Sequence, residues 1–442
     1  MKQFSLLTAF LCAVSMLTAQ VQLPAKYVAR EGTASAALKQ ELAAQRSLIV
    51  TQKLDYMVGN TSVSGKPISS ITGELSVVPD VAKIQAKNQR MNERLKTLPL
   101  PEDVIIQASP CATQSKYDAR NANLITPIRN QMCGNCWAFG AVGAYEANYL
   151  KVNGGSPNSL DLSEQHAQTC SGGGSCAGGF AYHVFEWMAD QGKDLKTEAQ
   201  LPQTGNNAAC GGNVDNQYDA VDWGVVHPSG DINKIASVAD IKKAICEYGA
   251  VSASVNVTGS FQNYTNGVYS GTPSDYNNPS TNHAIVLVGW DDTKGAWLLK
   301  NSWGSANWGE DGYMWIKYGS NNVGRRAAWI RAKKNCSRFA GTWKNIDPNT
   351  KGVTKIIAET TGAASIRTYG QCSPVDCDWG TSAAFSLPSI YPYEYYVSYN
   401  DAAAKRYMYF DLDCTDTYLT VKLVSNYHDN RPTRTDTYKF KK

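Results

Sequence analysis

The chain has 442 residues, of which 43% are hydrophobic and 18% are charged, and its formal net charge at pH 7 is +4. This balance is that of globular domains and excludes a mostly disordered chain. The length predicts about two or three domains. No segment is basic enough to indicate a nucleic-acid partner.

Residues 1–19 have the features of a secretory signal. Lys2 supplies the positive start, residues 4–17 are largely apolar, and Ala19 is a small residue before a plausible cut. The apolar run is shorter than the roughly 20 residues that span a bilayer, which disfavours the alternative of a membrane anchor. We therefore expect a secreted or periplasmic protein that has no membrane attachment once the signal is removed.

The cysteine count agrees with export. The chain has 12 cysteines, and Cys12 lies inside the signal, so eleven remain. An odd number in an exported chain indicates one free, reactive thiol, and the other ten allow up to five disulfides. Many disulfides are typical of an oxidising compartment.

Residues 20–110 form an N-terminal segment that differs in pattern from the rest of the chain. The composition predicts helices over residues 36–48 and 81–95, and the Ser-, Gly- and Thr-rich residues 61–76 predict turns or short strands between them.

The next part, residues 111–334, has a helical half followed by a strand-rich half. Helices are expected from about Cys136 to Val152, ending at Gly154, and over residues 241–248. The apolar and alternating runs predict strands over residues 251–257, 283–290, 296–300 and 313–318.

Residues 335–442 differ in composition, since eleven of the 24 tyrosines lie there. Short β-rich runs, punctuated by Pro, Gly, Asn and Asp, predict a small antiparallel β-domain, either a sandwich or a barrel. The runs are residues 354–358, 365–369, 407–412, 418–424 and 435–440. With Gly341-Thr342-Trp343 and the run of residues 372–380, this part resembles a β-domain of bacterial secreted proteins, and its partner is unknown.

Three separated segments carry chemistry. Cys136 follows a glycine turn at the start of a predicted helix, where the macrodipole favours the thiolate. His283 begins an apolar strand 147 residues later, within the roughly 130–150 residues typical of papain-like enzymes, and Asn301 lies a little beyond. Together these segments resemble the papain family of cysteine proteases, over residues 111–334.

The resemblance implies an α+β fold, with a helical lobe and a β-barrel-like lobe, preceded by a pro-segment and followed by the β-domain. It implies that Cys136 is the nucleophile, that His283 is its base and later the acid, and that Asn301 orients the imidazole. Gln131 would donate to the oxyanion, together with the backbone N–H of Cys136. Asn135 departs from the family, which usually has Ser or Ala before the nucleophile.

The resemblance also places a substrate site. Gly178 and Gly179 correspond to the strip where the substrate backbone lies, because glycine permits close approach. The residues expected to line the pocket for the side chain two positions before the cut are Phe180, Ala181, Asn282 and Ser254. Trp303 would cover the Asn301–His283 hydrogen bond. Because no acid stands at these places, we expect an apolar side chain to be preferred there over a basic one.

The family disulfides that can be placed are Cys133–Cys176 and Cys170–Cys210. A third family pair has no counterpart, since Arg325 and Arg326 stand at its C-terminal end. The other six cysteines can be paired as Cys111–Cys246, Cys336–Cys414 and Cys372–Cys377.

Other readings of the motifs are less favoured. A redox pair at Cys133 and Cys136 would not need His283, Asn301 or Gln131. A zinc site would need a second close pair of ligands at comparable spacing. We therefore expect neither a metal nor a cofactor. A catalytically dead papain-fold binding protein would usually lack the Cys, His or Gln. A further alternative is that the β-domain binds a surface and the protease acts as its effector.

These observations predict four parts, namely a signal (residues 1–19), a pro-segment (20–110), a papain-like peptidase domain (111–334) and a C-terminal β-domain (335–442). We expect an endopeptidase that acts on protein or peptide substrates through a thioester intermediate. It would be made as a latent zymogen, with the pro-segment crossing the site in the reverse direction to substrate, and activated by a cut between Leu98 and Lys116.

Overall fold

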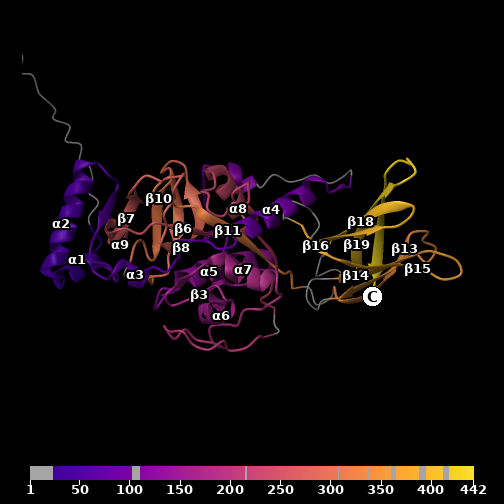
Figure 1. Cartoon of the computed structure of the whole chain (residues 1–442), viewed down its shortest axis with the longest axis horizontal. Coiled ribbons are helices and arrows are strands. Elements are labelled where there is room, and N and C mark those ends of the chain that lie inside the picture. Colours follow the sequence, from indigo (N-terminus) through magenta and orange to yellow (C-terminus); the bar gives the residue numbers. More distant parts are fainter. Residues whose placement is uncertain are drawn as a thin grey trace, which may run out of the picture.

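The computed structural model describes residues 23–101, 110–214, 217–306, 308–335, 339–359, 365–387, 395–411 and 418–442. The expected signal lies outside these ranges, as do Cys336 and Cys414. Figure 1 shows the parts in a row, with α1 and α2 at one end, a mixed helical and β part in the middle, and the C-terminal strands at the other end. Within the described ranges, every helix is too short or too polar to cross a membrane.

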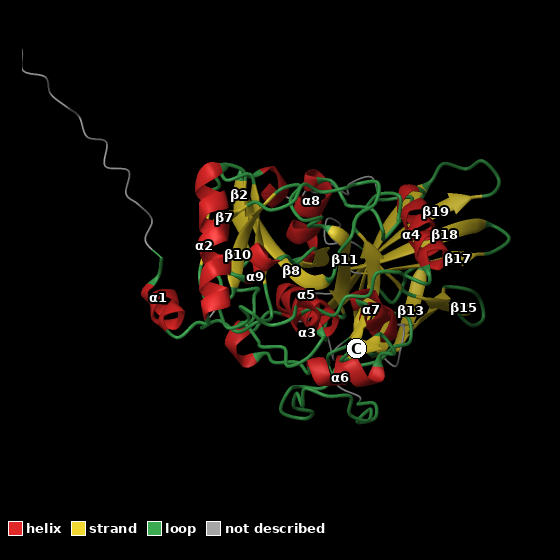
Figure 2. Ribbon diagram, turned by 60° about the vertical axis from the view of Figure 1, so that its left-hand side comes forward, coloured by secondary structure: helices red, strands yellow, loops and turns green. Residues whose placement is uncertain are grey.

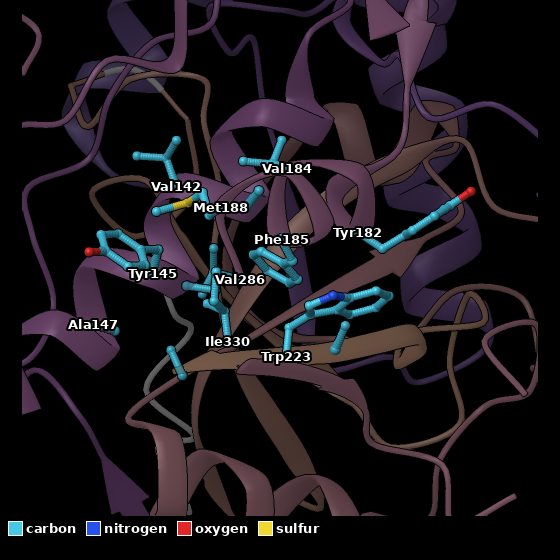
Figure 3. Close-up of a cluster of buried hydrophobic side chains, with 14 of the residues drawn as sticks. Val142, Tyr145, Ala147, Tyr182, Val184, Phe185, Met188, Trp223, Val286 and Ile330 are labelled. Atoms are coloured by element: carbon cyan, nitrogen blue, oxygen red, sulfur yellow. The ribbon is translucent and has the colours of Figure 1, made fainter. Parts of the chain in front are cut away.

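The central helix, α5 (Cys136–Asn153), is buried along almost its whole length. It ends at Gly154, whose φ of 71° and ψ of −164° lie in a region of backbone conformation that is open to glycine but not to residues with a Cβ. Beside it lie α6 (Glu164–Cys170) and α7 (Ala181–Ala189). Figure 3 shows Val142 and Tyr145 of α5 in one cluster with Phe185 of α7. The helix expected over residues 136–152 is confirmed.

The strand-rich half is one sheet of nine strands. In spatial order these are β1 (Tyr56–Val58), β7 (Tyr264–Tyr269), β10 (Tyr313–Lys317), β9 (Ala296–Lys300), β8 (His283–Asp291), β6 (Val251–Val255), β11 (Arg325–Ala332) and β5 (Ala220–Val225), and β2 (Lys116–Asp118) pairs with β8 off this path. All pairings are antiparallel except that of β7 with β10. The helix α8 (Val238–Tyr248) lies beside this sheet (Figure 2), and its buried residues belong to the same hydrophobic cluster as those of the sheet. The strands expected from the sequence are confirmed.

The remaining short elements of this part are η1 (Pro110–Thr113), η2 (Pro157–Ser159), β3 (Gly174–Ser175), β4 (Gly178–Gly179) and α9 (Gly259–Gln262). The disulfide Cys111–Cys246 joins η1 to α8, with the two Cα atoms 5.8 Å apart.

The N-terminal segment (residues 23–101) has no core of its own. Its elements are α1 (Ala25–Gly32), α2 (Ala36–Thr51), β1, α3 (Ile68–Ile71) and α4 (Val81–Lys96). Ser35 caps α2 through a 3.2 Å hydrogen bond from the N–H of Leu38. The helices α2 and α4 confirm the expectation from composition, whereas α1 and the four-residue α3 were not expected.

Burial explains where this segment sits. Leu42 of α2 and Val58 of β1 belong to the same hydrophobic cluster as the central sheet, whereas Ile84 of α4 belongs to the cluster of α5. The N-terminal segment therefore spans both halves of the central part.

The C-terminal part is an antiparallel sheet, as expected. Its strands, in spatial order, are β15 (Cys377–Ala383), β14 (Ser365–Gly370), β13 (Val353–Glu359), β12 (Gly341–Asn345), β20 (Arg434–Lys441), β19 (Tyr418–Tyr427), β18 (Ala404–Asp411), β17 (Tyr395–Asn400) and β16 (Phe385–Ser386). The sheet curls back on itself, since Ser382 Oγ of β15 donates to the carbonyl of Ser398 in β17 at 3.1 Å. Four of these strands, β12, β15, β16 and β17, were not expected from the sequence.

Candidate active site

Cys136 is the first residue of α5 and is fully buried. The N–H of Ala284 donates to its sulfur at 3.4 Å. Burial raises the pKa of the Cys136 thiol to about 12, although the N–H groups of Ala284 and Gly73 act to lower it. In this closed arrangement the sulfur is therefore a neutral thiol at pH 7.

His283 is the first residue of β8, and one of its two ring nitrogens is hydrogen-bonded. Its Nε2 lies 2.8 Å from Asn301 Oδ1, an oxygen that also accepts from the N–H of Ser302. Because Oδ1 is an acceptor, Nε2 carries the proton. Nδ1 is buried without a hydrogen-bond partner among the described residues.

The environment of His283 favours the neutral ring. Burial lowers the pKa of His283 to about 4, and the hydrogen bond with Asn301 opposes this shift. The indole of Trp303 lies over it, with the ring centroids 4.8 Å apart. The structure thus brings His283, Asn301 and Trp303 together as the sequence led us to expect.

Gln131 is fixed at both ends of its side-chain amide. Its Nε2 donates to the carbonyl of Cys133 at 2.9 Å, and its Oε1 accepts from Ser302 Oγ at 2.7 Å. The second hydrogen of Nε2 remains available for another acceptor.

Asn135, which departs from the family pattern, hydrogen-bonds a side chain of α6. Its Nδ2 donates to Gln168 Oε1 on α6 at 2.7 Å, and the side chain is completely buried. The asparagine is therefore accommodated by a hydrogen bond between the turn that precedes α5 and the helix α6.

Gly178 and Gly179 form β4, and the N-terminal segment lies along them. The N–H of Gly179 donates to the carbonyl of Gly73 at 2.9 Å, and the N–H of Leu75 donates to the carbonyl of Gly179 at 3.3 Å. The pairing of Glu74 with Gly179 is parallel. Gly178 has a φ of 129°, and a Cβ there would come within 2.8 Å of Leu75 Cδ2, so this close approach requires glycine.

The same stretch is held on its other side by the strand-rich half. The carbonyl of Asn282 accepts from the N–H groups of Gly73 and Glu74 at 3.2 and 3.0 Å. The indole N–H of Trp303 donates to the carbonyl of Ile71 at 3.0 Å. Residues 71–75 therefore run between the two halves, over the start of α5.

Asn282 and Ala181 were also expected to line the pocket for the side chain two positions before the cut. The side chain of Asn282 hydrogen-bonds the backbone of Val257, at 2.8 and 3.2 Å, while its carbonyl accepts from the N-terminal segment. Ala181 begins α7. Phe180, in contrast, is buried beside an arginine whose Cζ lies 5.0 Å from its ring centroid.

That arginine, Arg326, is the residue that sequence reasoning missed. Its Nη1 lies 3.1 Å from Glu74 Oε1, and the two side chains are only 4% and 3% exposed. Ser254 Oγ, which was expected to line the pocket, donates to the same carboxylate. The apolar preference was expected because no acidic residue was found among the lining residues, and a basic residue was not looked for. Arg326 is distant in sequence from every other lining residue, so no local pattern indicated it.

The cysteine framework agrees with the sequence where it is described. Disulfides join Cys133 to Cys176, Cys170 to Cys210, Cys111 to Cys246 and Cys372 to Cys377. Cys136 is the free cysteine among the described residues. Within the described ranges, one group of side chains of the types that bind metals lies close together: His166, Cys170 and Cys210. Both of its sulfur atoms are joined in the Cys170–Cys210 disulfide.

Comparison with known proteins agrees with this geometry. Residues 113–332 match the papain family cysteine protease model. The chain is 34% identical over 213 residues to Cysteine proteinase 3 of Solanum lycopersicum, which covers 47% of this chain and 57% of that protein. It is 32% identical over 214 residues to Cysteine proteinase 2 of Entamoeba histolytica, covering 47% and 64%. The chain thus spans less than two thirds of the length of these relatives.

Among solved structures, digestive procathepsin L2 proteinase from Tenebrio molitor larval midgut superposes with a TM-score of 0.52 and 23% identity, covering 71% of this chain and 96% of that one. This likeness is one of fold, and its extent is larger than residues 113–332 alone. Together with the family match and the grouping of Cys136, His283 and Asn301, it leads to one conclusion. Residues 113–332 of this chain form a papain-family cysteine protease domain.

Proposed function

We propose that the protein is an exported cysteine endopeptidase that is made in a latent form. In the active form Cys136 is the nucleophile, His283 exchanges its proton, Asn301 orients the imidazole, and Gln131 with the N–H of Cys136 stabilises the oxyanion. Four disulfides among the described residues and a signal-like N-terminus support export.

The reaction uses these groups in sequence. His283 takes the thiol proton, and the sulfur attacks the scissile carbonyl carbon to form a tetrahedral oxyanion. The C–N bond breaks as the imidazolium returns the proton to the leaving amine, which leaves a thioester on Cys136. Water, deprotonated by His283, then cleaves the thioester and regenerates the thiol. Asn301 contributes through the 2.8 Å hydrogen bond that fixes the tautomer of His283.

Latency is carried by a single observation, the parallel pairing of Glu74 with Gly179. A substrate that pairs with this strip in the family orientation is antiparallel to it. The N-terminal segment therefore occupies the substrate position with its peptide bonds reversed, so that no carbonyl is presented productively to Cys136.

The segment is held in place at points along its whole length. Tyr27 OH donates to the carbonyl of Gly309 at 2.7 Å, and Thr61 Oγ1 donates to the carbonyl of Gln262 at 2.9 Å. Further along the segment, Asn88 Oδ1 of α4 accepts from the N–H of Val225 in β5 at 2.8 Å. These contacts on both sides of residues 71–75 give the latent form its stability.

The test compares the uncut protein with protein cut between Leu98 and Lys116. The uncut form should neither hydrolyse a mixed peptide library nor react with a thiol alkylator at Cys136, and the cut form should do both. The Cys136→Ala variant, cut in the same way, controls for a contaminating protease. Equal activity of the cut and uncut forms would refute latency, and a cut form without any peptidase activity would refute the proposed enzyme.

A further inference from the structure

We infer that the active form selects an acidic side chain, Glu or Asp, two residues before the scissile bond, and that Arg326 is the residue that selects it. This inference rests on the proposed function and names the substrate class of the same site. We refer to Phe180, Ser254 and Arg326, the residues around the carboxylate of Glu74, as the Glu74 site.

The first observation is the place of Glu74 relative to the nucleophile. Gly73, whose N–H faces the sulfur of Cys136, is the preceding residue, and Glu74 pairs directly with Gly179. A substrate strand of opposite direction would use the same N–H and carbonyl of Gly179. The side chain at that position would then face the same wall, and this is the wall that the family resemblance assigns to the residue two before the cut.

The second observation is that the Arg326 guanidinium depends on the N-terminal segment for all its described hydrogen bonds. Its Nη1 donates to the carbonyl of Leu75 at 2.7 Å, its Nη2 donates to the carbonyl of Ser76 at 2.9 Å, and Nη1 also contacts Glu74 Oε1 at 3.1 Å. Its Nε is buried with no partner among the described residues. When the segment leaves, this cation loses these partners and becomes available to another carboxylate, to which a guanidinium forms charge-assisted hydrogen bonds.

The neighbouring Arg325 shows the opposite arrangement. Its guanidinium donates to Thr281 Oγ1 at 3.1 Å and to Asn233 Oδ1 at 2.9 Å, both in the protease domain itself. Burial, assisted by the charge of Arg326, lowers the pKa of Arg325 to about 10. Of these two adjacent arginines, Arg325 is therefore satisfied by the protease domain, and Arg326 is hydrogen-bonded to the N-terminal segment.

The third observation is backbone geometry. Arg326 has a φ of 54°, a left-handed conformation that a long side chain rarely adopts, and the register of β11 against β6 shifts between Arg325 and Ala328. A bulge of this kind redirects a side chain away from the regular alternation of a strand. Unfavourable backbone of this type persists where it positions a functional group, and here it aims Arg326 at the Glu74 site.

The remaining wall suits a carboxylate. Ser254 Oγ donates to Glu74 Oε1, and the ring of Phe180 lies against the arginine. A substrate carboxylate would therefore receive hydrogen bonds from one hydroxyl and one guanidinium, whereas a basic side chain would be repelled by Arg326. The sequence-based expectation of an apolar preference is replaced by a preference for acid.

The primary test measures kcat/KM of the cut, segment-free protein on peptides that differ only two residues before the cut, with Glu, Gln, Leu or Arg there. A hydrogen bond between charged groups predicts a preference for Glu over Leu and Gln of roughly tenfold or more, with Arg the poorest. Arg326→Met should reverse the order of Glu and Leu, and Arg326→Lys should retain a preference for Glu. The matched control, Arg325→Met, should leave the Glu-to-Leu ratio unchanged. Equal rates for Glu and Leu in the unmodified protein would overturn the inference.

A second measurement determines the affinity of the Glu74 site for an acidic side chain without requiring peptide hydrolysis. A synthetic peptide of residues 68–80 is titrated calorimetrically into the cut protein, beside the same peptide carrying Glu74→Gln. We expect the Gln peptide to bind roughly tenfold more weakly, and equal affinities would overturn the inference even if the enzyme is active. If no peptide is hydrolysed and yet the Glu peptide binds more tightly, the proposed function fails and the acidic site stands.

Discussion

Gly73 of the N-terminal segment lies directly against the carbonyl of Gly134, in the turn that precedes Cys136. A methyl group placed on Gly73 would come to 1.9 Å from the oxygen of Gly134, and its next nearest neighbours are also backbone atoms of Gly134. Because backbone cannot move aside as a flexible side chain does, this contact admits no residue other than glycine. The segment and the turn are therefore fitted to each other at the point that covers Cys136.

Gly73→Ala should for this reason weaken latency. The clash has to be relieved by lifting residues 71–75, which exposes the thiol, and we expect the uncut variant to react with an alkylator at least about tenfold faster than the unmodified chain. The matched control is Gly32→Ala, because a Cβ on Gly32 would meet nothing within 4 Å. An uncut Gly73→Ala protein with an unreactive Cys136 would show that the segment does not close the site through this contact.

The catalytic assignments predict a graded loss of kcat/KM in the cut protein. Cys136→Ala and His283→Ala should each lose at least about a thousandfold, since these groups form and break bonds. Asn301→Ala should lose less, because Asn301 acts only through the orientation of His283. His428→Ala on the C-terminal sheet is the control, and it should be unchanged, since its Nε2 lies 3.2 Å from Asn400 Oδ1, a residue of that sheet. Comparable losses for His428 and His283 would contradict the assignment.

The latent form should lose stability in acid. Burial lowers the pKa of His283 from its ordinary value of 6.5 to about 4, so the closed state binds fewer protons than the opened or unfolded chain between these pH values. The titration of His283 therefore leaves the stability of the closed state unchanged above pH 6.5. Between pH 6.5 and pH 4 the free energy of unfolding of the closed state decreases as the pH falls, by up to about 3 kcal/mol.

This pH dependence is measured on Cys136→Ala protein, which cannot process itself. Its thermal midpoint should fall between pH 7 and pH 4.5, and adding His283→Gln should make that fall smaller, because glutamine does not titrate. If both proteins show the same fall in midpoint, the acid sensitivity does not come from His283.

The C-terminal sheet should protect the expected activation region. Leu98, at the end of the N-terminal segment, is buried in a cluster with Tyr396, Tyr409 and Val424, and Tyr409 OH donates to the carbonyl of Pro99 at 2.6 Å. Burying one leucine side chain contributes about 2 kcal/mol, so Leu98→Asp should release this end of the segment.

Limited proteolysis checks this expectation. The Leu98→Asp protein should be cut between residues 98 and 116 several-fold faster than the unmodified chain at the same protease concentration. Leu48→Asp, a substitution of the same kind at a position that is 51% exposed on α2, serves as the control and should leave the rate unchanged. Cutting at equal rates in both variants would mean that the C-terminal sheet gives this region no protection.

The amino-acid sequence determined those features that depend on local pattern. The apolar run of α5, the composition of α2 and α4, and the apolar runs of β8 and β9 predict their own elements, because the pattern of apolar residues indicates which residues are buried. The motifs at Cys136, His283 and Asn301 likewise identified the grouping that the structure brings together. In the C-terminal part the strongest β-rich runs were recognised, whereas β12, β15, β16 and β17 were not, since their strand character depends on pairing with neighbours.

Only the tertiary structure decided what surrounds that grouping. Glu74 and Arg326 meet across some 250 positions of sequence, and neither stands in a motif. Their ion pair exists because the N-terminal segment passes between the two halves of the protease domain and because a bulge turns Arg326 toward it. The same burial keeps Cys136 and His283 neutral, although the helix N-terminus alone favours a thiolate. Desolvation depends on every atom packed around a group, and that packing is not encoded in any local pattern.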